Sequence, residues 1–167
     1  MRLALKENDM RYVVCALAVS ASLAGLGAAV AIAATPKENH AAYVRRDNAM
    51  KEIGRNFYVG IGWVTQGKLP FSQDTVTAAE NTVRLIPGMV SLFPVGSDVP
   101  ESHLKAGLTN DPEKVKDLVD KVQKSAATLV DDVKTGDKEK IAAIFKTVDD
   151  ACQLCHNDYR KPYPPAK

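Results

Sequence analysis

ACQLCHNDYR, residues 151–160, places two cysteines and a histidine close together near the C-terminal end of the sequence. Cys152 and Cys155 are separated by two residues, and His156 follows directly. On a helix, residues three and four positions apart share a face, so these three side chains would project together. They continue the spacing of the apolar residues that precede them, Ile141, Ile144, Phe145 and Val148. We therefore expect a helix whose inward face carries two thiols and an imidazole.

Several chemistries use cysteines at this spacing. A thiol redox pair normally lies at a helix N-terminus, where the dipole lowers the thiol pKa, whereas this pair comes late in the expected helix. A zinc site needs further ligands, and the other two histidines, His40 and His103, are expected at exposed positions. A structural disulfide or a pair of free thiols also fits. In covalent haem attachment, both thiols add to haem vinyl groups and the adjacent imidazole binds the iron. We favour haem, because chance poorly explains this motif on an apolar helical face in a chain whose only other cysteine is Cys15.

The beginning of the sequence has the pattern of an export signal. Basic residues precede an apolar run that extends to Ala34, and Ala31-Ile32-Ala33 fits the A-x-A pattern of a signal-peptidase site. We predict that residues 1–34 are a signal peptide, that it is removed, and that residues 35–167 form one domain in the periplasm. A retained membrane anchor is the alternative, because the run is long enough to span a bilayer. Met1 and Met10 both remain candidates for the initiator.

The charge of the chain is nearly balanced, with 22 Lys+Arg against 20 Asp+Glu. Nucleic-acid-binding domains usually carry a basic excess, so we expect no nucleic-acid partner. After removal of the signal peptide we also expect no stable membrane insertion. The even charge gives no indication of the sign of a partner protein, and both monomer and homodimer remain open.

Four stretches have apolar residues at every third or fourth position, the spacing of an amphipathic helix. Capping residues such as Ser72 and Asp137, together with glycines and prolines, separate them. Pro87-Gly88 lies inside the second stretch and is expected to kink or loosen it. The stretches cover residues 37–66, 72–93, 112–135 and 137–161, and a longer connection over residues 94–110 is expected to carry local order. This pattern predicts an all-α fold, an antiparallel up-down-up-down four-helix bundle.

The haem motif extends to C-x-x-C-H-x-x-Tyr-Arg, and it lies on the last helix of the four-helix pattern. The chain therefore resembles the cytochrome c′ family, the class II c-type cytochromes. The resemblance implies one covalent haem c, attached through Cys152 and Cys155, with His156 as an axial ligand of the iron. It is weakest from Val99 to Leu108, where a tryptophan-containing segment common in the family is not found. Outside the haem motif, the residues that carry the resemblance are Arg46 with Met50, Gly54-Arg55-Asn56, Leu92-Phe93-Pro94 and Gly96-Ser97.

The resemblance also implies which residue faces the other side of the iron. In the family, the first helix presents this residue four positions after an arginine, which matches Arg46 and Met50. A low-spin branch of the family uses methionine as the sixth ligand, and a thioether raises the reduction potential relative to two nitrogen ligands. We predict that Met50 is a ligand. The alternative is that Met50 fills the core, as methionine often does; Met89, the other sulfur candidate, is expected in the core.

Two arginines are candidate haem contacts. The resemblance implies that Arg46 lies near the haem edge, where it could pair with a propionate through a bidentate charge-assisted contact. A solvated charge is the alternative. Arg160, four residues after His156, is placed by the resemblance near the proximal haem surface, and its alternative role is to complement the dipole at the helix C-terminus.

These residues predict a periplasmic electron-transfer cytochrome with one covalent haem held by His156 and Met50, acting with redox partner proteins. The main alternative is a five-coordinate cytochrome c′ that binds nitric oxide or carbon monoxide. A small haem enzyme such as a peroxidase is less favoured, because no distal histidine or acid is apparent near Met50 to act on an O–O bond. We therefore do not expect an enzyme.

Overall fold

The structure is a computed structural model that describes residues 34–162. The predicted signal peptide, apart from Ala34, and both candidate initiators lie outside the described residues. Within the described part of the chain, no helix combines the length and the apolar character that a membrane crossing requires.

The first helical segment begins at α1 (Pro36–Gly54) with a capping box. The Thr35 hydroxyl accepts a hydrogen bond from the backbone N–H of Glu38 at 3.3 Å, and the Glu38 carboxylate accepts from the backbone N–H of Thr35 at 2.7 Å. These bonds satisfy N–H groups that have no partner inside the helix. The segment continues as the π-helix η1 (Arg55–Gly62) and ends in α2 (Trp63–Thr65). The predicted helix is confirmed, whereas its π-helical part was not predicted.

Two glycines allow neighbouring helices to approach the π-helical part closely. A Cβ atom at Gly60 would lie 2.5 Å from Cβ of Ala78, and one at Gly62 would lie 2.9 Å from the ring of Phe145. Both distances are shorter than side-chain contacts allow. The missing side chains therefore let η1 pack directly against the second and fourth helical segments.

The second helical segment starts where Ser72 caps α3 (Gln73–Leu85). The Ser72 hydroxyl accepts from the backbone N–H of Asp74 at 3.2 Å, which confirms the predicted cap. At Ile86, directly before Pro87, the segment changes to the 3-10 helix η2 (Ile86–Leu92). Proline lacks the N–H that an α-helix needs, so the predicted loosening at Pro87-Gly88 is confirmed.

The third segment is interrupted, unlike the continuous helix that its spacing predicted. It consists of α4 (Pro112–Ser125), capped by Asp111, and α5 (Leu129–Lys134). Between them, the Thr128 hydroxyl donates to the carboxylate of Asp132 at 2.7 Å, a local bond with which the helix resumes. The buried apolar face of the segment continues beyond the interruption, where Leu129 and Val133 are both buried.

The fourth segment is α6 (Lys138–Tyr159), which carries the cysteine pair. Asp137 caps it as predicted, because its carboxylate accepts from the backbone N–H groups of Glu139 at 2.9 Å and Lys140 at 3.3 Å. The helix ends at Arg160, whose backbone is extended.

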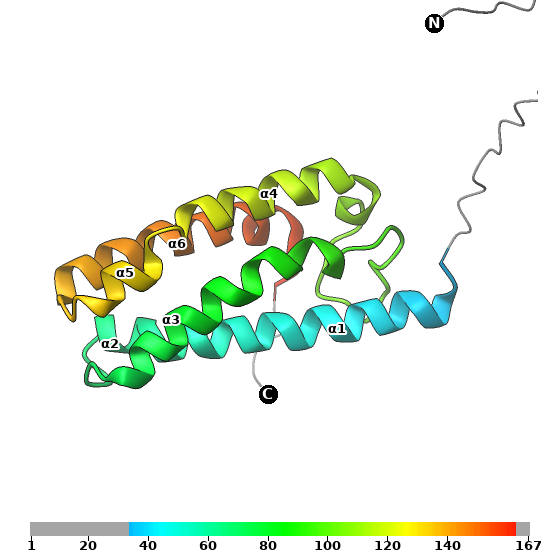
Figure 1. Cartoon of the computed structure of the whole chain (residues 1–167). Helices are drawn as coiled ribbons and strands as arrows, with labels where there is room; N and C mark the ends of the chain where they lie inside the picture. Colours follow the sequence, from blue (N-terminus) through cyan, green and yellow to red (C-terminus); the bar gives the residue numbers. More distant parts are fainter. Residues whose placement is uncertain (1–33, 163–167) are drawn as a thin grey trace, which may run out of the picture. The chain divides into compact units, whose positions relative to one another are not determined.

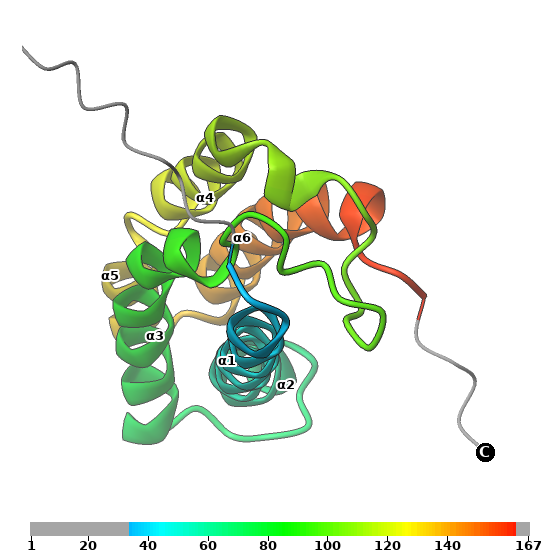
Figure 2. The same ribbon diagram turned by 90° about the vertical axis from the view of Figure 1, so that its right-hand side faces the viewer.

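The four segments pack side by side as the predicted bundle, without a β-strand in residues 34–162 (Figures 1 and 2). The segment containing α1 packs against α3, and α6 packs against both α4 and α5. The side chains of the core are almost entirely apolar, as burial of a helical stripe requires. Its largest fully buried apolar side chains are Phe57, Ile61, Ile86, Leu108, Leu129, Val133, Ile141 and Val148.

The long connection between the second and third segments has the local order that its length predicted. It contains the short 3-10 helix η3 (Leu108–Asn110). The Asp98 carboxylate accepts hydrogen bonds from the backbone N–H of Gly107 and the hydroxyl of Thr109, each at 3.1 Å. Residues 93–111, here called the α3–α4 connection, therefore form an ordered part of the fold.

Candidate functional site

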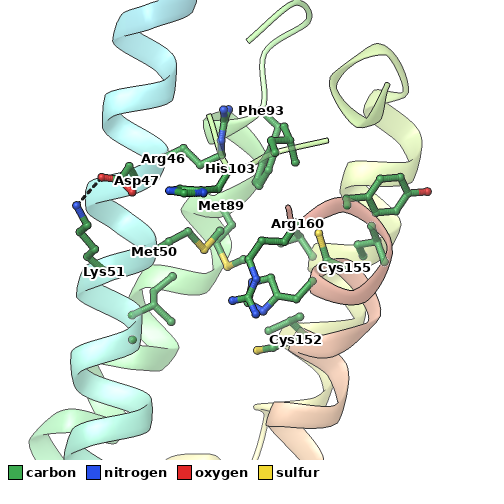
Figure 3. Close-up of a pocket in the computed structure, with 18 of the residues that line it drawn as sticks. Arg46, Asp47, Met50, Lys51, Met89, Phe93, His103, Cys152, Cys155 and Arg160 are labelled. Atoms are coloured by element: carbon green, nitrogen blue, oxygen red, sulfur yellow. Dashed lines mark hydrogen bonds and ion pairs between the residues drawn. The ribbon is translucent and has the colours of Figure 1, made fainter. Parts of the chain in front are cut away.

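A cavity of about 350 Å³ lies between α1, η2, the α3–α4 connection and α6. Its volume falls within the range of small-molecule and cofactor sites. Met50 on α1 and the pair Cys152 and Cys155 on α6 lie on opposite sides of it (Figure 3). His156 also lines the cavity, so the structure brings the predicted attachment motif and the predicted distal residue to one site.

The two thiols do not have the properties of a redox pair. Both cysteines are free and half-buried. Burial raises the pKa of Cys152 to about 12, with smaller contributions from Asp149 and Cys155, and burial also raises the pKa of Cys155. A reactive redox thiol needs a lowered pKa, so the raised pKa values do not favour the redox interpretation. The zinc interpretation also finds no support, because residues 34–162 contain no group of three metal-ligating side chains of His, Cys, Asp or Glu.

His156 has the properties of an iron ligand. Burial and the charge of Arg160 lower its pKa, against an opposing effect of Asp149, which favours the neutral imidazole that binds metals. Its Nδ1 atom is buried and has no hydrogen-bond partner in the described structure. Such a buried polar atom is rare in proteins unless another group satisfies it. Two thiols, a neutral imidazole and a cavity with a mainly apolar wall therefore fit a covalently attached haem.

The wall opposite α6 carries two methionines. Met50 and Met89 are both half-buried, and both project into the cavity from α1 and η2 (Figure 3). For Met50 this position agrees with the sequence analysis. Met89 packs against the core as expected, but it also forms part of the cavity wall.

Arg46 is fastened to the protein itself. Nη1 donates to the Leu92 carbonyl at 3.0 Å and the Ser97 hydroxyl at 2.9 Å, while Nη2 donates to the Ser97 carbonyl and the Ser102 hydroxyl, both at 2.8 Å. The guanidinium carbon lies 5.3 Å from the centre of the Phe93 ring. Burial lowers the pKa of Arg46, an effect that the charge of Asp98 opposes.

These bonds bear on both interpretations of Arg46. The solvated-charge alternative is wrong, because the residue is only 5% exposed. The contact with a haem propionate stays a prediction. A guanidinium has four terminal N–H groups and one Nε–H, so a bidentate contact would have to displace bonds that now hold the α3–α4 connection.

Arg160 lies at the end of α6 and lines the cavity, as its predicted place near the proximal surface requires. The backbone around it is bonded to the α3–α4 connection. Arg160 pairs with Leu104 in an isolated β-bridge, the Lys105 N–H donates to the Tyr159 carbonyl at 2.7 Å, and the Lys161 N–H donates to the His103 carbonyl at 2.7 Å. The connection is therefore fixed at both walls of the cavity. Contact between Arg160 and haem stays a prediction.

Sequence reasoning missed several residues of the site, among them His103 and Tyr58. His103 was expected at an exposed position, but it is half-buried and lines the cavity, whereas His40 is exposed as expected. Nothing in the pattern of the α3–α4 connection indicates which of its side chains faces inward. Tyr58 also lines the cavity. Its position eight residues after Met50 places it on the same helical face, a signal that could have been used.

Residues 41–160 match the family model described as Cytochrome C′. The cytochrome c′ of Rhodocyclus tenuis is 30% identical over 97 residues, which cover 54% of this chain and 73% of the relative. Cytochrome c prime from Shewanella frigidimarina has a similar structure, with a TM-score of 0.68 and 27% identity, over 77% of this chain and 100% of that chain. A carbon monoxide-bound variant of cytochrome c prime from Alcaligenes xylosoxidans has a TM-score of 0.65 and 22% identity, over 74% of this chain and 97% of that chain. A nitric oxide-bound variant has a TM-score of 0.65 and 21% identity, over 75% of this chain and 97% of that chain. Both show the same fold as this chain.

Proposed function

Because this chain belongs to the cytochrome c′ family and carries one covalently bound haem c, we propose that it binds nitric oxide or carbon monoxide in the periplasm. The observation that carries this proposal is the apolar wall opposite His156, which includes Met50, Met89 and Ile53. The polarity and steric access of a distal pocket select its ligand. An apolar wall suits small neutral diatomic gases, which need no hydrogen-bond donor to bind. The gas-bound forms of the Alcaligenes protein support the same function.

Each wall of the cavity has its own role in this function. The bound haem supplies an iron atom that takes up a gas molecule or an electron. Cys152 and Cys155 hold the group covalently to α6, and His156 presents a neutral imidazole to it. Met50 limits the space on the opposite side, so only small ligands are admitted. The surrounding apolar side chains exclude water, which would otherwise compete for the site.

Electron transfer with Met50 as the sixth ligand is the second candidate. The observation that favours it is the position of Met50, which lines the same cavity as His156 and projects into it. A thioether bond would close the distal side and limit rearrangement during a redox cycle. The relatives favour gas binding, since variants of the Alcaligenes xylosoxidans protein hold carbon monoxide or nitric oxide. Activity as an enzyme is not expected for either function.

The ferric absorption spectrum of the purified holoprotein separates the two candidates. Gas binding predicts a high-spin ferric spectrum, and a ferrous form that binds carbon monoxide. Met50→Ala should leave the spin state unchanged and speed carbon monoxide association, because the change removes bulk from the distal wall. Met89→Ala is the matched control and should have the smaller effect. A low-spin wild type whose sulfur-to-iron band disappears in Met50→Ala would replace gas binding with electron transfer.

A further inference from the structure

Three polar side chains form a cluster that neither candidate function uses. The Tyr58 hydroxyl donates to Oδ1 of Asp149 at 2.6 Å, although the two residues are 91 positions apart. The side-chain amide of Gln153 donates to the same oxygen at 3.1 Å and to the Tyr58 hydroxyl at 3.4 Å. The cluster therefore joins η1 to α6 close to the cysteine pair.

Packing fixes the position of the Tyr58 hydroxyl. The Tyr58 ring meets Phe57 and Phe145 edge-on, with ring centres 5.1 Å and 6.0 Å away, and Phe57 and Phe145 stack on each other at 4.5 Å. Tyr58 is 36% exposed, so its burial is only partial. This partial burial raises the pKa of Tyr58 well above its ordinary value, and the hydrogen bond and charge of Asp149 add to the effect. The hydroxyl therefore remains a hydrogen-bond donor at neutral and moderately alkaline pH.

The cluster holds a carboxylate next to the haem attachment motif. Asp149 is half-buried and precedes Cys152 by three residues and His156 by seven, a spacing that keeps all three on one side of α6. Seven residues correspond to about 10 Å along a helix axis. The Asp149 charge acts on both residues, while Arg160 acts in the opposite sense on His156.

We propose that Asp149, held in place by Tyr58 and Gln153, lowers the reduction potential of the haem iron. Ferric haem carries one more positive charge than ferrous haem, so a fixed negative charge nearby stabilises the ferric form. Asp149 acts on the iron through its charge, and Tyr58 and Gln153 are positioning residues that hold Asp149. The inference rests on the bound haem and on neither candidate function, so it holds for a gas-binding and an electron-transferring protein alike.

Asp149→Asn tests the proposal in the holoprotein, by spectroelectrochemical titration. For an assumed separation of about 10 Å between the carboxylate and the iron and an effective dielectric constant of about 20, removal of the charge should shift the ferric–ferrous equilibrium about tenfold, which is about 59 mV upward for one electron. Asp150→Asn is the matched control, since Asp150 is an exposed neighbour with the same charge that pairs with Lys146 at 2.6 Å. It should shift the potential much less.

Tyr58→Phe separates the positioning role from the charge. The ring and its packing remain, but the carboxylate loses its shortest hydrogen bond and becomes better screened by water. We expect a rise in potential that is smaller than that of Asp149→Asn, and this variant carries the test if Asp149→Asn yields no holoprotein. Equal shifts of the reduction potential in Asp149→Asn and Asp150→Asn would overturn the proposal. If Asp149→Asn yields no holoprotein, an unchanged reduction potential in Tyr58→Phe would overturn it instead. The spin state of each variant reports separately on gas binding and on Met50 ligation.

Discussion

The two walls of the haem cavity are built in different ways. On the α6 side, Cys152, Cys155 and His156 lie within residues 152–156 and are positioned by the hydrogen bonds of one helix. On the opposite side, Met50, Met89 and His103 come from α1, η2 and the α3–α4 connection. Side-chain bonds of Arg46 hold the connection against α1. The first wall therefore depends on local structure, and the second on contacts between distant segments.

The largest expected effect concerns the α6 wall. Cys152→Ala/Cys155→Ala should abolish covalent haem attachment, because no thiol remains to form a thioether. Haem staining of the protein after denaturing electrophoresis measures this loss. Leu154→Ala is the control, since this side chain lies between the cysteines but is 48% exposed, and it should keep its haem. Covalent haem in the double variant would contradict the assignment of the attachment site.

The next effect concerns the opposite wall. Arg46→Met should lower the free energy of unfolding by about 3 kcal/mol, because buried carbonyl and hydroxyl groups lose their charged donor. Denaturant titration of the holoprotein measures the change, and limited proteolysis should show faster cleavage within residues 93–111. Arg45→Met is a control with the same change of side chain at an exposed neighbour. Similar losses in the two variants would show that Arg46 does not hold this wall.

A smaller effect is expected where η1 meets α3. Gly60→Ala should cost about 1–3 kcal/mol, because the added Cβ would lie 2.5 Å from that of Ala78. Gly88→Ala should change stability much less, since a Cβ there meets no atom within 4 Å. Thermal denaturation of the two holoproteins compares them. A Gly60→Ala variant as stable as wild type would mean that the two helices need not approach so closely.

The smallest expected effect is the pH dependence of the α3–α4 connection. Burial acts to raise the pKa of Asp98, but hydrogen bonds from the backbone and Thr109 and the charge of Arg46 outweigh it, so the pKa is lowered. A lowered pKa in the folded state adds stability above the unfolded value of about 3.9, and this stability is lost as the pH falls further. Asp98→Asn should therefore be less stable than wild type at pH 7, and the difference should shrink below about pH 4. A difference that stays constant down to pH 2 would exclude this role of Asp98.

The predictability of the structure follows the same division between local and long-range contacts. The attachment motif, the four helical segments and the caps at Ser72 and Asp137 depend on neighbouring residues, and the sequence indicated each of them. The interruption between α4 and α5 left the apolar spacing intact, so that spacing could not reveal it. The π-helix depends on how closely Gly60 and Gly62 approach other segments, which no local pattern records.

The inward position of His103 and the partners of Arg46 were beyond sequence reasoning for a related reason. Arg46 bonds to residues 46 to 56 positions away. His103 is turned toward the cavity by a connection that is fastened at Arg46 and at the end of α6. Both positions depend on the path of an irregular connection, for which helical periodicity gives no information.

The bonds between the α3–α4 connection and residues 159–161 also couple the end of α6 to the opposite wall of the cavity. Tyr159, Arg160 and Lys161 follow the cysteine pair directly in the chain, so the element that carries the attachment motif also carries one of the two anchors of the connection. A chain that ends at Asp158 would keep the whole attachment motif and lose this anchor.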